Sequence, residues 1–211
     1  MQRGIFRPRK GIGMDRSGSN YTAACVLLAA GSGTRFGGGK LLATFKGKPL
    51  FEHAMDALPG DAFVRTIVVS GDADILAEAL RRGFLPVRND APEEGVSLSI
   101  RLGLRAAGPC SAVLFLVGDQ PLLTAGSVRH ILAAGQARPE KIIVPQRPDG
   151  QSGNPCLFPA AFFPELLSLK GDCGGRRVIL AHPEAVFPVS VPEEELFDAD
   201  TKDELHRLEK A

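Results

Sequence analysis

A glycine-rich stretch that follows a short apolar run constrains this chain more than any other feature. The apolar run covers residues 25–28, and five of the nine residues 31–39 are glycine. A run this short, closed by Ala29-Ala30-Gly31, predicts a buried strand. Glycines let the backbone turn sharply, and the free N–H groups of such a turn form a concavity that holds anions. Because the charges of this stretch belong to Arg35 and Lys40, the pattern predicts a polyphosphate site.

Two better-known phosphate loops do not fit this stretch. The P-loop pattern G-x-x-x-x-G-K-[ST] would need a glycine in place of Thr34 and a hydroxyl in place of Leu41. The dinucleotide pattern G-x-G-x-x-G would need a glycine in place of Phe36. The loop therefore belongs to neither class.

Size and composition predict one α/β domain. The chain has 211 residues, of which 44% are hydrophobic, and this is enough for a single sizeable core. Its net charge of +1 gives no field that would attract nucleic acid or a membrane surface, and no apolar run is as long as a bilayer span. The four cysteines lie far apart without a C-x-x-C pair, so a zinc site is not expected, and free thiols indicate a cytoplasmic protein.

Residues 1–22 form a basic N-terminal extension. They carry five cations against one acid and lack the apolar segment of a secretory signal. A nucleic-acid arm is one reading, but an untidy terminal extension fits better, and we expect this segment to be poorly ordered. The folded domain is then expected to cover residues 23–211.

Strand-like and helix-like segments alternate after residue 22. The strand candidates are residues 24–28, 66–70, 84–87, 112–117, 141–145 and 185–191. The helix candidates are residues 50–58, 74–82, 98–107, 127–136, 160–167, 175–181 and 201–210. This order predicts a mostly parallel sheet with helices on both faces, and ligands bind such sheets beyond the carboxyl ends of the strands.

A second candidate site element closes the apolar run at residues 113–117. The run ends in Gly118-Asp119-Gln120-Pro121. A carboxylate at the tip of a buried strand lies at the ligand-binding edge of the sheet, and Mg²⁺ takes one or two carboxylates together with phosphate oxygens. Asp119 is therefore a candidate ligand for Mg²⁺ (or Mn²⁺), with a simple capping role as the alternative.

Several of these motifs together resemble one enzyme family. The pattern L-A-A-G-x-x-x-R-x-G-x-x-K, which spans residues 28–40, resembles the signature loop of the nucleotidyltransferases of molybdenum-cofactor biosynthesis. Residues 95–104 resemble its G-x-S-x-S-x-R-x-G-L segment, and residues 118–121 resemble its metal-binding aspartate motif. The resemblance extends from about residue 23 to about residue 208. It implies a Rossmann-like three-layer α/β/α nucleotidyltransferase fold with a mostly parallel central sheet.

The resemblance also implies roles for individual residues. Catalysis would rest on Arg35, Lys40 and Asp119, with Asp119 and Asp200 as metal ligands. Nucleotide-binding positions would be Leu28, Ala29, Ala30, Gly31, Gly33, Lys40, Asn89, Gly95, Ser97 and Ser99. Acceptor-binding positions would be Asn154, Pro155, Asp172, Gly174 and Arg176. Simple capping competes with these roles, by Ser97 for its helix and by Asp198 or Asp200 for the last one.

The resemblance favours one reaction. Leu-Ala-Ala-Gly in the first loop is typical of the cytidylyl branch, whereas Leu-Ala-Gly-Gly is typical of the guanylyl branch. The chain is therefore expected to join CMP from CTP to the terminal phosphate of a molybdopterin-type cofactor and to release pyrophosphate, with a molybdenum hydroxylase or its chaperone as a candidate partner. The alternatives are a guanylyltransferase of the same cofactor, a cytidylyltransferase for a sugar or isoprenoid precursor, and a non-catalytic nucleotide-binding maturation factor.

Overall fold

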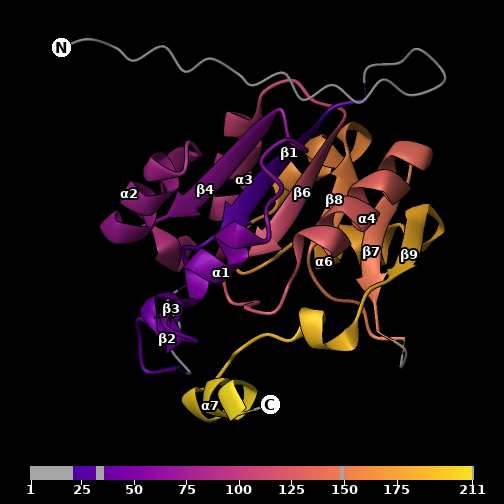
Figure 1. Cartoon of the computed structure of the whole chain (residues 1–211). Coiled ribbons are helices and arrows are strands. Elements are labelled where there is room, and N and C mark those ends of the chain that lie inside the picture. Colours follow the sequence, from indigo (N-terminus) through magenta and orange to yellow (C-terminus); the bar gives the residue numbers. More distant parts are fainter. Residues whose placement is uncertain (1–20, 32–35, 148–149, 211) are drawn as a thin grey trace.

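A twisted, mostly parallel sheet forms the centre of the molecule (Figure 1). The computed structural model describes residues 21–31, 36–147 and 150–210. Within them, seven strands lie in the order β5-β4-β1-β6-β8-β7-β9. Their bounds are β1 Ala23–Leu28, β4 Arg65–Ser70, β5 Leu85–Arg88, β6 Ala112–Val117, β7 Ile142–Gln146, β8 Cys156–Pro159 and β9 Val186–Ser190. A small antiparallel hairpin, β2 Thr44–Phe45 with β3 Lys48–Pro49, lies outside this sheet.

The helices cover both faces of the sheet, so the predicted three-layer α/β/α fold is confirmed. They are α1 Leu50–Asp56, α2 Ala73–Arg81, α3 Val96–Ala107, α4 Ala125–Ala137, α5 Phe163–Ser168, α6 Arg176–Ala181 and α7 Lys202–Lys210. Alternate residues of β1 point to opposite faces. Cys25 and Leu27 pack with α1, α2 and α4, whereas Ala24 and Val26 pack with α3, α5 and α6. Burial on both faces explains why β1 and β6 are continuous apolar runs.

Strand β8 was not predicted from the sequence. It runs antiparallel to both β6 and β7, whereas the remaining pairs of the sheet are parallel. Its four residues follow one proline and end at another, so the apolar run is too short and too strongly interrupted to stand out as a strand. The other predicted strands and the predicted helices are present, with ends shifted by at most three residues.

The helix caps differ in part from those expected. Asp72 caps α2 by accepting hydrogen bonds from the backbone N–H groups of Asp74 and Ile75. The expectation that Ser97 caps α3 is wrong, because α3 begins at Val96 and its N-cap is Gly95, whose φ of +87° favours glycine. The last helix is capped by Thr201 and Glu204, which form a capping box instead of the suggested Asp198 or Asp200.

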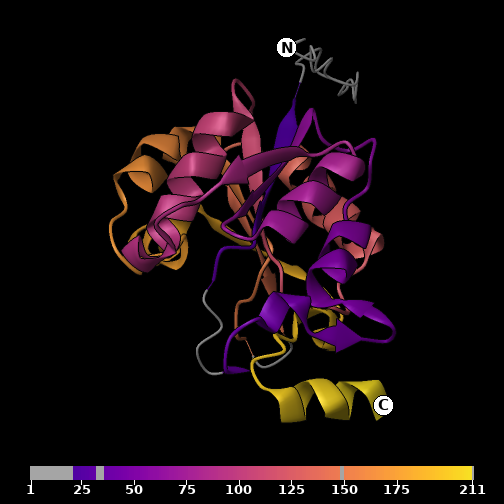
Figure 2. The same cartoon turned by 90° about the vertical axis from the view of Figure 1, so that its left-hand side faces the viewer.

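A third, smaller cluster of apolar side chains lies below the carboxyl ends of β1 and β6. The helix α7 crosses under this edge of the sheet beside the β2–β3 hairpin (Figure 2). Leu205 of α7 packs with Phe36, Phe45, Leu50 and Ala199. The C-terminal helix is thereby held against the chain that follows the glycine-rich loop. In the part of the chain that the structure describes, no helix is long and apolar enough to cross a membrane.

The N-terminal boundary is described only from Tyr21 onward. Tyr21 packs against the core, and the backbone N–H of Thr22 donates a hydrogen bond to Ser111 Oγ at 3.1 Å. The proposed basic extension lies outside the described residues up to residue 20.

A glycine in α3 allows the helix to approach the sheet closely, and its substitution tests the packing. A Cβ added at Gly103 would lie 2.3 Å from Val26 Cγ1 and 3.2 Å from Val69 Cγ2. We therefore expect Gly103→Ala to destabilise the fold by about 1–3 kcal/mol despite the higher helix propensity of alanine. In a chain of this size each kcal/mol lowers Tm by about 2–4 °C, which thermal unfolding would measure.

The matched control is Gly126→Ala in α4. Among the described residues, the nearest neighbour of a Cβ there would be Thr124 Oγ1, at an ordinary 3.5 Å. We expect its Tm to stay the same or rise slightly. Equal Tm values for the two variants would show that close packing of α3 is not limiting.

Candidate functional site

A cavity of about 280 Å³ opens at the carboxyl ends of β1 and β6. The chain passes from β1 to β4 and β5 on one side, and then returns to β6 on the other side of β1. This reversal of strand order leaves a crevice between β1 and β6, which is where open α/β sheets bind ligands. The cavity is lined by Leu28, Ala30, Gly31, Lys40, Leu41, Pro92, Gly95, Val96, Ser99, Val117, Gly118, Asp119 and Asp172.

The glycine-rich loop turns as the sequence predicts in the part that is described. Gly37, Gly38 and Gly39 all have positive φ, at 85°, 92° and 64°. L side chains rarely adopt this conformation, so three glycines in a row are needed here. The loop then delivers Lys40 at the start of the short 3₁₀ helix η2, Lys40–Leu42. Gly33 and Arg35 lie outside the described residues.

The ammonium group of Lys40 joins two carboxylates from distant parts of the chain. Lys40 Nζ lies 2.7 Å from Asp119 Oδ2 and 2.7 Å from Asp200 Oδ1. Its side chain is only 10% exposed. Burial alone would lower the pKa of Lys40, but the hydrogen bonds to Asp119 and Asp200 outweigh it, and the pKa is raised. The lysine is therefore a permanent cation between two acids.

Backbone contacts explain why these acids meet. Asp119 follows the end of β6, and its carbonyl oxygen accepts a hydrogen bond from the Ala199 N–H at 3.0 Å. Asp200 is the next residue, so this one bond places it beside the tip of β6. The buried side chain of Ala199 anchors the same segment in the cluster under the sheet.

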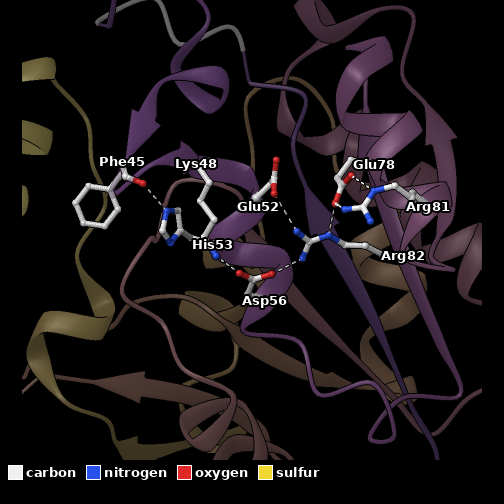
Figure 3. Close-up of polar contacts among 8 residues, drawn as sticks. All are labelled: Phe45, Lys48, Glu52, His53, Asp56, Glu78, Arg81 and Arg82. Atoms are coloured by element: carbon white, nitrogen blue, oxygen red, sulfur yellow. Dashed lines mark hydrogen bonds and ion pairs between the residues drawn. The ribbon is translucent and has the colours of Figure 1, made fainter.

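A network of ion pairs joins the β2–β3 hairpin, α1 and α2, which follow Lys40 in the chain (Figure 3). Arg82, which follows α2, contacts Glu52 and Asp56 of α1 as well as Glu78 of α2. Asp56 also pairs with Lys48 of the hairpin, and the His53 Nε2–H donates to the Phe45 carbonyl oxygen at 2.8 Å. Because α1 packs against η2, this network ties the position of Lys40 to the main sheet.

A third acid, Asp198, lies close to this group. Although Asp198 is an exposed residue, its carboxyl group is largely surrounded by protein. Desolvation and the negative charge of Asp119 raise its pKa to about 6. The neighbouring Gln120 amide opposes this shift, but its geometry falls short of a hydrogen bond. Both of its amide atoms are buried, and neither has a hydrogen-bond partner among the described residues.

Residues assigned to the nucleotide divide into two groups. Leu28, Ala30, Gly31, Gly95 and Ser99 line the cavity beside Lys40. Ala29, Asn89 and Ser97 are buried behind its wall. Asn89 Nδ2 donates to Ser99 Oγ at 3.0 Å, so Asn89 orients a wall residue. Ser97 Oγ instead accepts from Arg101 Nη1 at 3.1 Å.

Of the residues assigned to the acceptor, Asp172 reaches the cavity. Gly174 packs near Val96, and Arg176 is an exposed residue at the start of α6. Asn154 and Pro155 lie directly before β8. None of these four belongs to the described lining of the cavity.

Sequence reasoning selected Leu28 and Ala30 but missed several other apolar residues of the lining. Leu41 and Val96 directly follow the selected residues Lys40 and Gly95. Val117 and Gly118 are the two residues before Asp119. Gly118 faces Leu41 so closely that a Cβ would lie 3.1 Å from its side chain. The spacing of the aspartate motif could have identified Gly118 as a lining residue. No such motif marks Pro92, which lies in the 3₁₀ turn before α3.

The acids of the site fit a divalent cation that phosphates help to bind. Asp119 and Asp200 present oxygens to one point, now held by Lys40 Nζ. The described residues include no group of three or more His, Cys, Asp or Glu side chains placed to hold a metal by themselves. Two carboxylates completed by phosphate oxygens and water are the usual environment of Mg²⁺ at nucleotides.

Comparison with known proteins places this geometry in a family. Residues 25–186 match the family described as the MobA-like NTP transferase domain. The Rv0371c structure from Mycobacterium tuberculosis superposes with a TM-score of 0.76 at 27% identity, over 90% of this chain and 99% of that one. The same protein is also known in complex with manganese.

The curated relatives carry several different names. A bifunctional protein GlmU from Kineococcus radiotolerans is 34% identical over 54% of this chain, which spans about a quarter (25%) of that relative. A nicotine blue oxidoreductase from Paenarthrobacter nicotinovorans is 29% identical over 87% of this chain and 94% of its own length. A probable molybdenum cofactor guanylyltransferase from Thermococcus gammatolerans is 27% identical over 88% of this chain and 98% of its own length.

The raised pKa of Asp198 predicts a pH-dependent effect of Asp198→Asn. The folded-state pKa of about 6 exceeds the unfolded value of about 3.9. The carboxyl therefore favours folding at pH 4 relative to pH 8, and its advantage is lost as the pH rises through 6. We expect Asp198→Asn to have a higher Tm than the wild type at pH 8, with a difference that falls towards pH 4. Thermal unfolding in metal-free buffer would measure this. A difference that is constant across pH, or a more stable wild type at pH 8, would contradict the assignment.

Proposed function

The chain belongs to the MobA-like NTP transferase family and is a nucleotidyltransferase, and on this premise we propose that it transfers CMP from CTP to molybdopterin. The acceptor group would be the terminal phosphate of a molybdopterin-type cofactor, and pyrophosphate would leave. The relatives do not share one activity by name, so the choice of substrates rests on the residues of the site.

One observation carries the proposal. Lys40 and Asp119 line the cavity at the ends of β1 and β6, and Asp200 pairs with the same lysine. A cation from a glycine-rich loop beside two carboxylates at the carboxyl ends of parallel strands suits a nucleoside triphosphate with its divalent cation. We propose that Lys40 exchanges its two carboxylate partners for phosphate oxygens when the nucleotide binds.

The proposed roles of the groups are electrostatic. Lys40, Arg35 and the N–H groups of the loop would bind the triphosphate and offset its charge. Asp119 and Asp200 would hold Mg²⁺ or Mn²⁺. Bound there, the cation would neutralise phosphate charge and favour in-line displacement of pyrophosphate.

The acceptor requires little activation by the protein. The second pKa of a phosphate monoester is about 6, so the attacking phosphate is largely ionised near neutral pH. A Ser–His pair is therefore unnecessary, and positioning of the two substrates supplies the rate enhancement. Asp172 on the cavity wall, with Asn154, Pro155, Gly174 and Arg176 outside it, would guide the acceptor to the nucleotide.

The preference for CTP is proposed from the cavity wall at Ala30. Ala30 lies where β1 gives way to the phosphate loop, and it lines the cavity. The base must lie near this backbone because the triphosphate is bound only a few residues further on. A methyl group here leaves room for a pyrimidine ring and crowds a purine.

The biological setting is proposed on the same footing. The cysteines of the chain are all free thiols, of which Cys25 and Cys156 are buried. Free thiols suit the reducing cytoplasm, where the product would pass to a molybdenum hydroxylase or its chaperone.

A panel of nucleoside triphosphates with and without molybdopterin tests the proposal. Pyrophosphate release should require both a triphosphate and molybdopterin, and CTP should be the best substrate. Best use of GTP would favour a guanylyltransferase, as the Thermococcus relative is named. Release with a sugar or isoprenoid phosphate would favour those substrates, and binding without any release would indicate a maturation factor.

Asp119→Asn should abolish the metal-dependent reaction. The amide keeps the size of the side chain but loses the charge that holds a dication. Pyrophosphate release, titrated with Mg²⁺ and with Mn²⁺, should fall at least about a hundredfold. Asp61→Asn is the matched control, because Asp61 is an exposed acid that pairs with Arg129 and is absent from the described lining of the cavity. An unchanged metal requirement in Asp119→Asn would place the main ligand elsewhere.

Ala30→Gly should relax the preference between the two bases. One methyl group supplies about 1–3 kcal/mol of discrimination, or roughly 10–200-fold. We therefore expect kcat/KM for GTP to rise within this range while kcat/KM for CTP changes little. A wild type that prefers GTP would overturn the cytidylyl assignment.

A further inference from the structure

Arg101 is the one charged residue of the 95–104 motif, and it lies at a junction of three segments. Its side chain is 17% exposed. Arg101 Nη1 donates to the Leu169 carbonyl oxygen at 2.6 Å and to Ser97 Oγ at 3.1 Å. Arg101 Nη2 lies 3.5 Å from Glu94 Oε2 in the turn before α3. The guanidinium therefore contacts the turn, the helix and a chain segment 68 residues further on.

The distant partner is the 169–172 segment, which links α5 to the loop before α6. Leu169 is buried at one end of this segment, and Asp172 lines the cavity at the other end. In the middle, the Gly171 carbonyl oxygen accepts a hydrogen bond from the Ser97 N–H at 3.3 Å. The segment thus spans the distance between the core and the site, and α3 holds it by two carbonyl groups.

The contact between this segment and the start of α3 leaves no space. A Cβ at Gly95 would lie 2.5 Å from the Gly171 carbonyl carbon and 2.6 Å from the Asp172 nitrogen. Gly95 lines the cavity together with Ser99, which stands one turn further along α3. The nucleotide side and the acceptor side of the cavity therefore share one packed boundary, and Arg101 lies directly behind it.

We propose that Arg101 is a positioning residue that holds the 169–172 segment, and with it Asp172, against the nucleotide wall so that the acceptor is received in register with the triphosphate. This inference rests on the proposed function for the identity of the two substrates. A carboxylate at Asp172 would repel a phosphate, so it suits N–H or O–H donors in the body of the acceptor.

The contact to the Leu169 carbonyl oxygen is the one that matters. The Glu94 side chain is 57% exposed, and an exposed ion pair at 3.5 Å contributes little. A charged donor to a carbonyl at 2.6 Å is a stronger interaction, and its acceptor belongs to Leu169, a buried residue. A lysine could donate to one of these acceptors, but it lacks the planar guanidinium group that contacts all three.

The test compares Arg101→Met with Arg101→Lys. Arg101→Met should raise the KM for molybdopterin roughly tenfold, the effect of losing one charge-assisted hydrogen bond. The KM for CTP should change less than about twofold, because Asn89 holds Ser99 independently of Arg101. The KM of Arg101→Lys for molybdopterin should lie between those of the wild type and Arg101→Met. In the unliganded protein, hydrogen exchange of the amides at 169–173 should speed up in Arg101→Met more than exchange in the central strands.

Arg65→Met is the matched control. Arg65 Nη1 donates to the Ala106 and Ala107 carbonyl oxygens at 2.8 and 3.2 Å, at the far end of the same helix. Arg65→Met should lower Tm by about as much as Arg101→Met does, and it should leave the KM for molybdopterin unchanged. An equal rise in KM in both variants would reduce Arg101 to a structural role, and an unchanged KM in folded Arg101→Met would overturn the proposal.

Failure of this inference can be told apart from failure of the proposed function. If the wild-type protein transfers no nucleotide to molybdopterin, the proposed function is wrong. The exchange experiment then still decides whether Arg101 holds the segment, because it needs no substrate. Unchanged exchange at residues 169–173 in Arg101→Met would overturn the positioning role by itself.

Discussion

The ion pairs of Lys40 with Asp119 and Asp200 are the interaction around which the site is built. They join the loop after β1, the tip of β6 and the approach to α7, three segments separated by 79 and 160 residues from the lysine to its two partners. Two acids this close would repel each other without the ammonium group, and burial would add to the cost. The helix α7, the hairpin and the Arg82 network all pack so that the three charged groups meet.

How much of this could be predicted depends on whether the signal is local. The apolar runs of β1 and β6 and the glycines at 37–39 dictate their own backbone, so the fold class was predicted correctly. The structure brings Lys40 and Asp119 together at 2.7 Å, and their roles stay predictions. Strand β8 was missed because four residues between prolines become a strand only through their partners in β6 and β7.

The site residues that sequence alone could not place depend on contacts across the fold. The motif spacing selects both Ser97 and Ser99, yet of the two only Ser99 lines the cavity. The helix α3 begins at Val96, two residues before the Leu98 start that a Ser97 cap would give. The environment of Asp198 depends on Asp119 and Gln120 at the end of another strand. The importance of Arg101 comes from a backbone carbonyl, which has no sequence signature at all.

The lysine between the two carboxylates also affects the stability of the protein when no substrate is bound. In a pocket lined by acids alone, the carboxylates would repel one another, and the folded state would be less stable without a bound cation. Here the chain carries a counter-charge of its own, because the Lys40 ammonium group offsets part of the negative charge of Asp119 and Asp200. The three segments can therefore stay together in the folded chain by means of the lysine alone.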